Sequence, residues 1–159
     1  MAVTIEAVPL SAKPVLAGLL QLYLHDFTDF EPREIGPDGQ YPYAYLDEYW
    51  SSAPGEQRYP FLIRDDGALA GFAMVRVVNG VNVLSEFFVL RGHRRRGVGE
   101  AAARQVFARL PGRWLVHEVP ANVPAQRFWR RVIGEVTGGN YEEETGDGLT
   151  QRFNTQVSR

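Results

Sequence analysis

The segment RGHRRRGVG, residues 91–99, combines residue types that can bind an anion. Its four arginines lie among glycines, an apolar run precedes it, and an alanine-rich segment typical of a helix follows. The first turn of a helix presents unpaired backbone N–H groups with a partial positive charge, and glycines let a ligand approach the backbone closely. Arginines beside such a turn add charge-assisted hydrogen bonds. The chemistry that fits is the binding of a phosphate or a pyrophosphate.

The same segment has other interpretations. A solvated basic turn would have a similar composition, because arginine supplies all but one of the 17 cationic residues of the chain. A P-loop is excluded because no G-K-[ST] follows, and the dinucleotide-binding fingerprint lacks one of its three glycines. A nucleic-acid site is disfavoured by the net charge of −2 and by the shortness of the cluster. A pyrophosphate site and a solvated turn both stay open at this point.

Glu86 is the candidate for proton transfer. It lies in an otherwise apolar run, three residues before Val89, and burial there would raise its pKa towards neutrality. Such a carboxylate could take the proton of an amine or bind the amine as an anion, whereas the structural alternative is a pair with a nearby arginine. The histidines at positions 25, 93 and 117 are too scattered for metal-ligand spacing, so no metal site is expected.

The composition bounds what can surround these residues. The chain has 159 residues, 45% hydrophobic and 23% charged, which predicts one globular domain over residues 1–159. The absence of cysteine excludes disulfides, thiol catalysis and cysteine-based zinc sites. The start of the chain has no pattern of a signal peptide, and no apolar run approaches the roughly 18 residues of a membrane span. We therefore expect a cytoplasmic protein without membrane or nucleic-acid partners.

The elements that must position the candidate residues follow from the spacing of apolar residues. Their order predicts an α/β fold in which one mixed sheet has helices on both faces. Helices are expected over residues 12–28, 43–50 and 97–110 and from Asn122 onward, with tight turns at Asp65-Asp66-Gly67 and Asn79-Gly80. Strands are expected over residues 3–10, 58–64, 68–78, 81–90, 114–119, 132–137 and 149–154.

A second motif lies downstream of the arginine–glycine segment. NVPAQRFW, residues 122–129, has an asparagine, an alanine three residues later, and then a hydrophobic–aromatic pair. This motif and SEFFVLRGHRRRGVGEAAA, residues 85–103, resemble motifs B and A of the GCN5-related N-acetyltransferase (GNAT) superfamily. The order of the expected elements matches that fold from end to end. The resemblance implies a mostly antiparallel mixed sheet with a splay between its fourth and fifth strands, and a bulge near residues 86–88.

The resemblance also implies a set of cofactor-binding residues. The backbone N–H groups of residues 94–99 would bind the pyrophosphate of acetyl-CoA, and the backbone at the end of the preceding strand would pair with the pantetheine arm. Asn122 would hydrogen-bond that arm, or cap its helix, or both. The residues so implied are Phe88, Val89, Arg91, Arg94, Arg95, Arg96, Gly97, Val98, Gly99, Glu100, Asn122 and Trp129.

The chain departs from the superfamily pattern at two positions. Arg91 stands where a proline usually ends the strand, and Trp129 stands where a tyrosine often protonates the departing thiolate. An indole N–H donates a hydrogen bond but is no acid at neutral pH. Either another group such as Tyr141 or water serves as the acid, or the thiolate leaves without one, since a free thiol has a pKa of about 8.5.

The implied reaction is direct transfer of an acetyl group from acetyl-CoA to an amine of a small molecule or of a protein, with Glu86 as the base or the amine-binding anion. In this fold the segment after the first helix lines the acceptor side. An acidic cluster there, Asp26, Asp29 and Glu31, would favour a cationic amine, although a solvated helix end has the same pattern. Aromatic residues could wall the pocket, some of them serving only as core: Tyr41, Tyr43, Tyr45, Tyr49 and Trp50. The alternative function is a CoA- or acyl-CoA-binding module of the same fold without turnover. The resemblance to the superfamily is also compatible with a homodimer.

Overall fold

A seven-stranded sheet runs through the computed structural model, which describes residues 2–51 and 55–156. The strand order is β1-β2-β3-β4-β5-β7-β6, and every neighbouring pair is antiparallel except β4 and β5. The strands are β1 (Val3–Ala7), β2 (Gln57–Asp65), β3 (Ala68–Val78), β4 (Val81–Val89), β5 (Gly112–Glu118), β6 (Glu142–Gly146) and β7 (Gly148–Thr155). The expected mixed, mostly antiparallel sheet is therefore confirmed.

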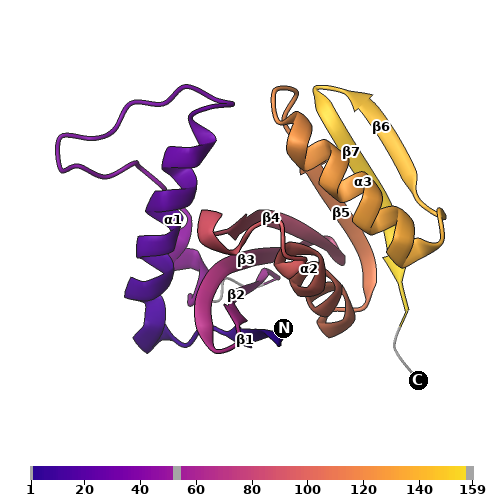
Figure 1. Cartoon of the computed structure of the whole chain (residues 1–159), viewed down its shortest axis with the longest axis horizontal. Helices are drawn as coiled ribbons and strands as arrows, with labels where there is room; N and C mark the ends of the chain where they lie inside the picture. The colour runs from indigo at the N-terminus through magenta and orange to yellow at the C-terminus, as the bar shows by residue number, and fades with distance from the viewer. Residues whose placement is uncertain (1, 52–54, 157–159) are drawn as a thin grey trace.

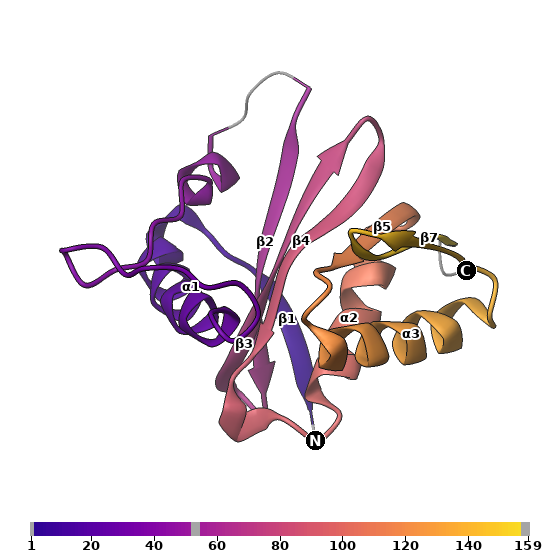
Figure 2. The same ribbon diagram turned by 90° about the horizontal axis from the view of Figure 1, so that it is seen from above.

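Helices cover both faces of this sheet (Figures 1 and 2). Helix α1 (Lys13–Phe27) lies on one face, and α2 (Val98–Arg109) and α3 (Val123–Thr137) lie on the other. Three short 3₁₀ turns complete the described elements: η1 (Leu10–Ala12), η2 (Leu46–Tyr49) and η3 (Arg91–His93). None of the helices in the described residues is long and apolar enough to cross a membrane.

Each face has its own hydrophobic core. Under α1, leucines at helical spacing, including Leu16 and Leu20, pack against Phe72 and Phe88 of the sheet. Under α2 and α3 a larger cluster forms, in which Phe107 and Trp114 stack edge to face with ring centroids 4.9 Å apart. Because both faces of β3 and β4 are covered, these strands are held firmly beneath whatever binds at their ends.

The tight turns expected from the sequence are present. Asp66 and Gly67 between β2 and β3, and Asn79 and Gly80 between β3 and β4, all have positive φ angles. This conformation at both central residues is that of the hairpin turn favoured by Asn-Gly and Asp-Gly. The two hairpins place β2, β3 and β4 side by side.

Strands β4 and β5 separate soon after they meet, as the expected splay requires. Their parallel pairing covers only Asn82↔Trp114 to Leu84↔Val116, whereas β4 continues to Val89. Figure 2 shows β5 and β7 turning away from β4. The β3–β4 register skips one residue at Ser85, so the bulge lies directly before Glu86 and not within residues 86–88.

The expected strand over residues 132–137 is wrong, because these residues are the last turns of α3. Trp129, Val132 and Ile133 are buried at the spacing of one helix face, and Gly138 ends the helix in the left-handed conformation with φ 62°. The sixth strand is instead β6, whose five residues are all exposed. The helix expected over residues 43–50 is reduced to η2, and β1 ends at Ala7 rather than at residue 10.

Gly71 is required where β3 meets the end of β4. A Cβ at this position would lie 1.9 Å from the carbonyl oxygen of Phe88. We expect Gly71→Ala to lower the free energy of unfolding by about 3 kcal/mol, because the strands must move apart, and the Tm by about 6–12 °C. Thermal unfolding monitored by circular dichroism measures this loss.

The matched control is Gly146→Ala in β6, because a Cβ there meets nothing within 4 Å. Its Tm should stay within about 2 °C of the parent protein, as for most exposed substitutions. Equal effects of the two substitutions would contradict the proposed steric cause.

Candidate functional site

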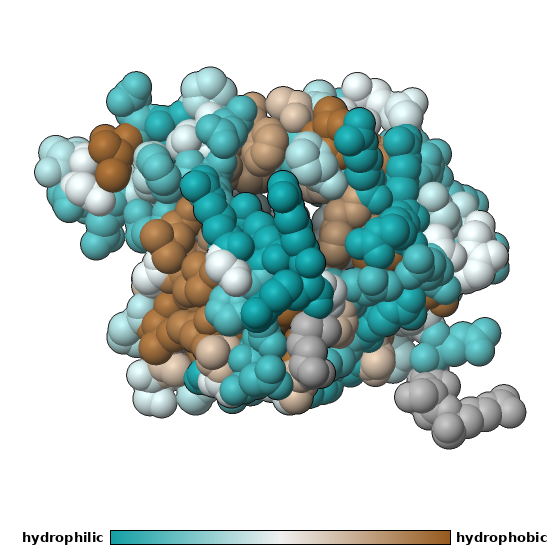
Figure 3. Space-filling model, viewed as in Figure 1, coloured by the Kyte–Doolittle hydropathy of each residue, from teal (hydrophilic) through white to brown (hydrophobic). Residues whose placement is uncertain are grey.

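Helix α2 begins at a glycine that leaves its first turn uncapped. Gly97 is the N-cap residue with φ 77°, and no side chain caps the helix. The N–H groups of Val98, Gly99 and Glu100 form the first turn, where no acceptor exists within the helix. Hydrophilic side chains gather near the centre of Figure 3, over the segment between β4 and α2. This helix start has the geometry of an anion site.

Two aspartates from distant elements bind three of the four arginines that precede α2. Asp26 of α1 accepts hydrogen bonds from Arg91 at 2.6 Å and from Arg94 at 2.8 Å. Asp65, buried at the end of β2, pairs with Arg96 and lies 2.9 Å from Nδ1 of His93. The segment is therefore not a free basic surface, since much of its charge is compensated by these carboxylates.

The pairing of Asp26 with two arginines does not favour its predicted role in acceptor binding. Partial burial acts to raise the pKa of Asp26, but the hydrogen bonds from Arg94 and Arg91 outweigh it and lower that pKa. The carboxylate is thus committed to the arginines and does not line the cavity described below. Arg95 differs from its neighbours: it has φ 63° and forms no ion pair with any residue in the described ranges.

Beyond the short pairing with β5, one edge of β4 is open. The N–H of Leu90 donates to the carbonyl oxygen of Ala70 at 2.7 Å, so alternation along the strand directs the backbone groups of Phe87 and Val89 to the opposite edge, towards the splay. The carbonyl oxygen of Val89 there accepts Nε of Arg94 at 2.8 Å. The backbone of Phe88 faces β3 instead, which does not favour the expected backbone contact of Phe88 with a pantetheine arm.

A cavity of about 780 Å³ lies at the splay. Residues of α1, β3, β4, β5 and α3 and of the segment after α1 line it. The cavity brings together several residues singled out from the sequence, Tyr43, Glu86, Asn122 and Trp129. Tyr45, Tyr49, Glu31 and His117 also line it, whereas Tyr41 bonds to His25 and Trp50 donates to the carbonyl of Val8.

Glu86 lines this cavity, and the pKa of its carboxyl is shifted from its ordinary value. Burial raises the pKa of its carboxyl to about 7, although the hydroxyls of Tyr23 and Tyr43 and the charge of Arg33 act in the opposite direction. A carboxyl that titrates near neutral pH can accept a proton from a bound amine and release it again. The expectation of a structural pair with an arginine is not met, since no ion pair of Glu86 occurs among the described residues.

Glu118 is a second such carboxyl, which sequence reasoning missed. It is buried at the end of β5, lines the same cavity, and burial raises its pKa to about 7. Nε2 of Gln151 donates to one carboxyl oxygen at 2.8 Å, whereas the other oxygen is buried and has no hydrogen-bond partner in the described part of the chain. The signal was available, because Glu118 is an isolated acid in an apolar strand in the same way as Glu86.

The residues of the second motif, NVPAQRFW at positions 122–129, lie partly at the cavity and partly in the core. The side chain of Asn122 accepts the N–H of Ala125 at 3.1 Å and so caps α3, while the residue also lines the cavity. Trp129 is only 6% exposed and packs edge to face on Phe87, with ring centroids 5.1 Å apart. Glu100 is another of the expected cofactor residues, and its carboxylate pairs with Arg104 and Arg131. Its backbone N–H belongs to the first turn of α2.

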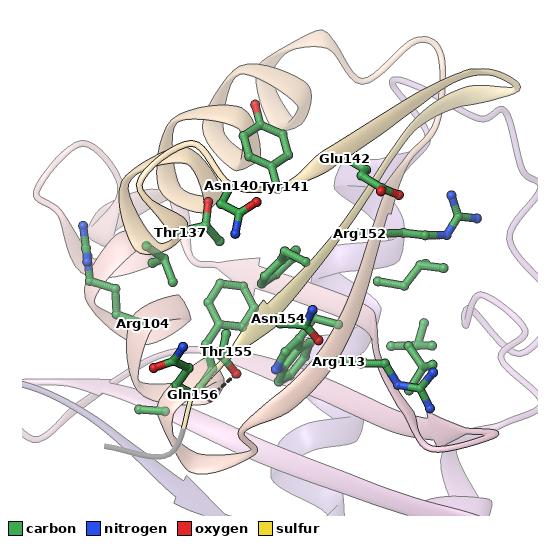
Figure 4. Close-up of a pocket in the computed structure, with 18 of the residues that line it drawn as sticks. Arg104, Arg113, Thr137, Asn140, Tyr141, Glu142, Arg152, Asn154, Thr155 and Gln156 are labelled. Carbon is green, nitrogen blue, oxygen red and sulfur yellow. Dashed lines mark hydrogen bonds between the residues drawn. The ribbon is translucent and has the colours of Figure 1, made fainter. Parts of the chain in front are cut away.

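Tyr141, the expected alternative acid, lies elsewhere. It lines a separate cavity of about 930 Å³ between the ends of α2 and α3 and the strands β5 and β7 (Figure 4). Its hydroxyl donates to Glu143 at 3.2 Å. It does not line the cavity that contains Glu86, so this position does not favour the predicted role of Tyr141 as the acid.

One family model matches most of the chain, and solved structures share its fold. Residues 16–134 match the model of the acetyltransferase (GNAT) family. The fold is similar to that of the ribosomal-protein-S18-alanine N-acetyltransferase of Escherichia coli, at 15% identity and TM-score 0.62, covering 99% of this chain and 97% of that one. It is also similar to PaiA N-acetyltransferase of Thermoplasma acidophilum in complex with coenzyme A, at 10% identity and TM-score 0.62, covering 97% and 99%.

A third similar structure is the aminoglycoside acetyltransferase AAC(6')-Ib in complex with coenzyme A, at 14% identity and TM-score 0.66, covering 96% of this chain and 95% of that one. No curated protein matches the chain in sequence. At these identities the structures show the shared fold alone, and the family follows from the matched model.

Proposed function

The chain belongs to the GNAT family of acetyltransferases, and from this premise we propose that it transfers an acetyl group from acetyl-CoA directly to an amine. The observation that carries the proposal is the cavity at the splay. It joins the open edge of β4 to a carboxyl whose pKa lies near 7. We further propose that residues 1–159 act as one domain, since β1 and β7 belong to one sheet.

The residues present fit the parts of acetyl-CoA. The uncapped first turn of α2 after Gly97 suits a pyrophosphate, with Arg95 as the arginine that no aspartate holds. The outward backbone groups of Phe87 and Val89 suit the amides of a pantetheine arm, which would extend the sheet as a further strand. Asn122 adds the unused donors of its side-chain amide.

Glu86 is the proposed base. When bound, acetyl-CoA supplies the acetyl group as a thioester, whose C–S bond breaks as the amine nitrogen forms the new C–N bond. Glu86 accepts the proton that the amine loses, the N–H of Val89 polarises the thioester carbonyl at the open edge, and CoA leaves as its thiolate. Trp129 contributes a hydrophobic wall and no proton.

A second candidate function is an acyl-CoA-binding module without turnover. Trp129 in the place of the tyrosine favours it, because no hydroxyl of α3 lines the described cavity. Glu118 weakens this case, since a second carboxyl with a pKa of about 7 could protonate a thiolate. Release of thiol in the presence of an amine separates the two functions.

Acetyl-CoA should raise the Tm of the protein. At a concentration of 100 times Kd the added stability is about 2.7 kcal/mol, and the Tm rises by about 5–10 °C. Differential scanning fluorimetry measures the shift, with NADH as a control pyrophosphate compound that should have no comparable effect. No shift with acetyl-CoA, CoA or a longer acyl-CoA would contradict the proposal. A shift without thiol release across a broad amine panel would favour the binding module.

A further inference from the structure

Two arginines lie directly opposite each other on the floor of the cavity. Arg58 of β2 and Arg76 of β3 are register partners, and both line the cavity that contains Glu86. Like charges in directly opposed positions of an antiparallel pair repel each other. The arrangement therefore costs stability unless other charges compensate the two guanidinium groups.

Only one of these arginines has such partners. Arg58 forms ion pairs with Glu48 at 2.9 Å and Glu56 at 3.2 Å, and its guanidinium lies 5.5 Å from the ring centre of Tyr49. Arg76 is exposed, and within residues 2–51 and 55–156 no ion pair or side-chain hydrogen bond involves it. Among the described residues, the positive charge of Arg76 at the cavity thus has no ion-pair partner.

Arg76 lies close enough to Glu86 for one small molecule to reach both. Glu86 lies opposite Met74 in the pairing of β4 with β3. Arg76 is two residues further along β3, on the same face and about 7 Å from Met74. The hydroxyl of Tyr43 is influenced by both charges. Burial and Glu86 raise its pKa, whereas Arg58 and Arg76 lower it. One hydroxyl therefore lies within the field of both the carboxyl and the guanidinium.

Other charged side chains also line the cavity. Glu31, Arg33 and Glu34 lie in the segment after α1, and the buried Glu118 lies in β5. Asp26, which was expected to attract a cationic amine, is held by Arg91 and Arg94. On β3 and β4, the carboxyl of Glu86 and the guanidinium of Arg76 make this part of the floor complementary to a molecule with one charge of each sign.

We propose that the acceptor is a small amine that also carries a carboxylate, of which an α-amino acid is the simplest case, with its amine at Glu86 and its carboxylate at Arg76. The inference rests on the proposed acetyl transfer and names its substrate class. An arginine binds a carboxylate through two parallel hydrogen bonds, which would also orient the amine towards the open edge of β4. An amine that lacks the carboxylate would place its positive charge near the guanidinium of Arg76 and would provide no negative charge to pair with it.

The test compares matched acceptors by CoA thiol release. Phenylalanine is paired with phenethylamine, and lysine with cadaverine, so that each pair differs only in the carboxylate. We expect kcat/KM for the amino acids to exceed that for the decarboxylated amines by tenfold or more. Arg76→Gln should raise KM for the amino acids about tenfold, the usual size of one lost charged hydrogen-bond pair, and leave KM for the decarboxylated amines unchanged. Arg76→Lys should restore part of the loss.

Arg113→Gln is the matched control, because Arg113 is an exposed arginine that lines the other cavity. It should change KM for neither acceptor class. Decarboxylated amines that react as well as the amino acids, or an equal effect of Arg76→Gln on both classes, would overturn this inference alone. If the parent protein binds acetyl-CoA but releases thiol with no amine, or does not bind it, the proposed function fails and the substrate class fails with it.

Discussion

Glu86→Gln should lower kcat for amine acetylation by about 100- to 1,000-fold, the usual contribution of a general base. Glutamine keeps the size and a hydrogen-bonding carbonyl but cannot accept a proton at neutral pH. Acetyl-CoA should bind the variant as it binds the parent, because Glu86 faces the cavity and lies outside the first turn of α2. Single-turnover thiol release and a thermal shift with acetyl-CoA measure the two properties separately.

The pH dependence of the reaction gives a second measurement on the same residue. The base acts in its ionised form, so kcat should rise with pH and level off above the pKa of Glu86, about 7. Since this pKa is raised above that of the unfolded chain, the carboxyl contributes stability at low pH that is lost as the pH rises through 7. Glu86→Gln should therefore not lower the Tm at pH 8, which separates a catalytic loss from unfolding.

Glu118→Gln provides the control for this assignment, because burial raises the pKa of Glu118 to about 7 as well. If Glu86 is the base, the rising limb of the pH profile disappears in Glu86→Gln and persists in Glu118→Gln. The opposite result would transfer the role of base to Glu118. A full rate in both single variants would contradict carboxylate catalysis at this cavity.

Features that depend on neighbouring residues could be predicted from the sequence. The start of α2 after Gly97, the cap at Asn122 and the two Asp-Gly and Asn-Gly turns each follow from a few adjacent residues and their backbone preferences. The order of the strands and the splay followed because the two motifs lie in the order and at the spacing of the family. The fold was therefore predictable to the level of its topology.

Features that depend on distant residues were not predictable in this way. Asp26 is 65 residues from Arg91, and only the packing of α1 beside the end of β4 brings them together. Tyr141 follows α3 closely in sequence, yet the length of the helix carries it to the other cavity. Strand β6 has no buried residue and thus no alternation of apolar residues to reveal it.

The arginines before α2 illustrate the same difference at the site itself. Their number suggested a basic surface, but Asp26 and the buried Asp65 bind three of them and fix the shape of the segment. What these contacts leave for a ligand is the backbone of the helix start and the side chain of Arg95. Binding of an anion should therefore depend more on the glycine at the helix start than on any single arginine.

Gly97→Glu should abolish the stabilisation by acetyl-CoA, with Kd raised by 100-fold or more. A non-glycine residue at φ 77° costs roughly 1–2 kcal/mol of strain at the N-cap, and the new carboxylate would lie beside the N–H groups proposed to bind a pyrophosphate. A 100-fold rise in Kd corresponds to a loss of about 2.7 kcal/mol of binding free energy. The Tm shift caused by acetyl-CoA should therefore fall from several degrees to almost none. Scanning fluorimetry across an acetyl-CoA titration measures it.

Gly39→Glu separates this effect from strain and charge in general. Gly39 has φ 76°, almost the angle of Gly97, and a Cβ there meets nothing within 4 Å among the described residues. This variant introduces the same residue at an equivalent backbone angle, far along the chain from α2, so it should lose similar stability and keep the full Tm shift. If Gly97→Glu retained the shift, the helix start would not be the pyrophosphate site, and if Gly39→Glu lost it as well, the loss would reflect the fold and not the site.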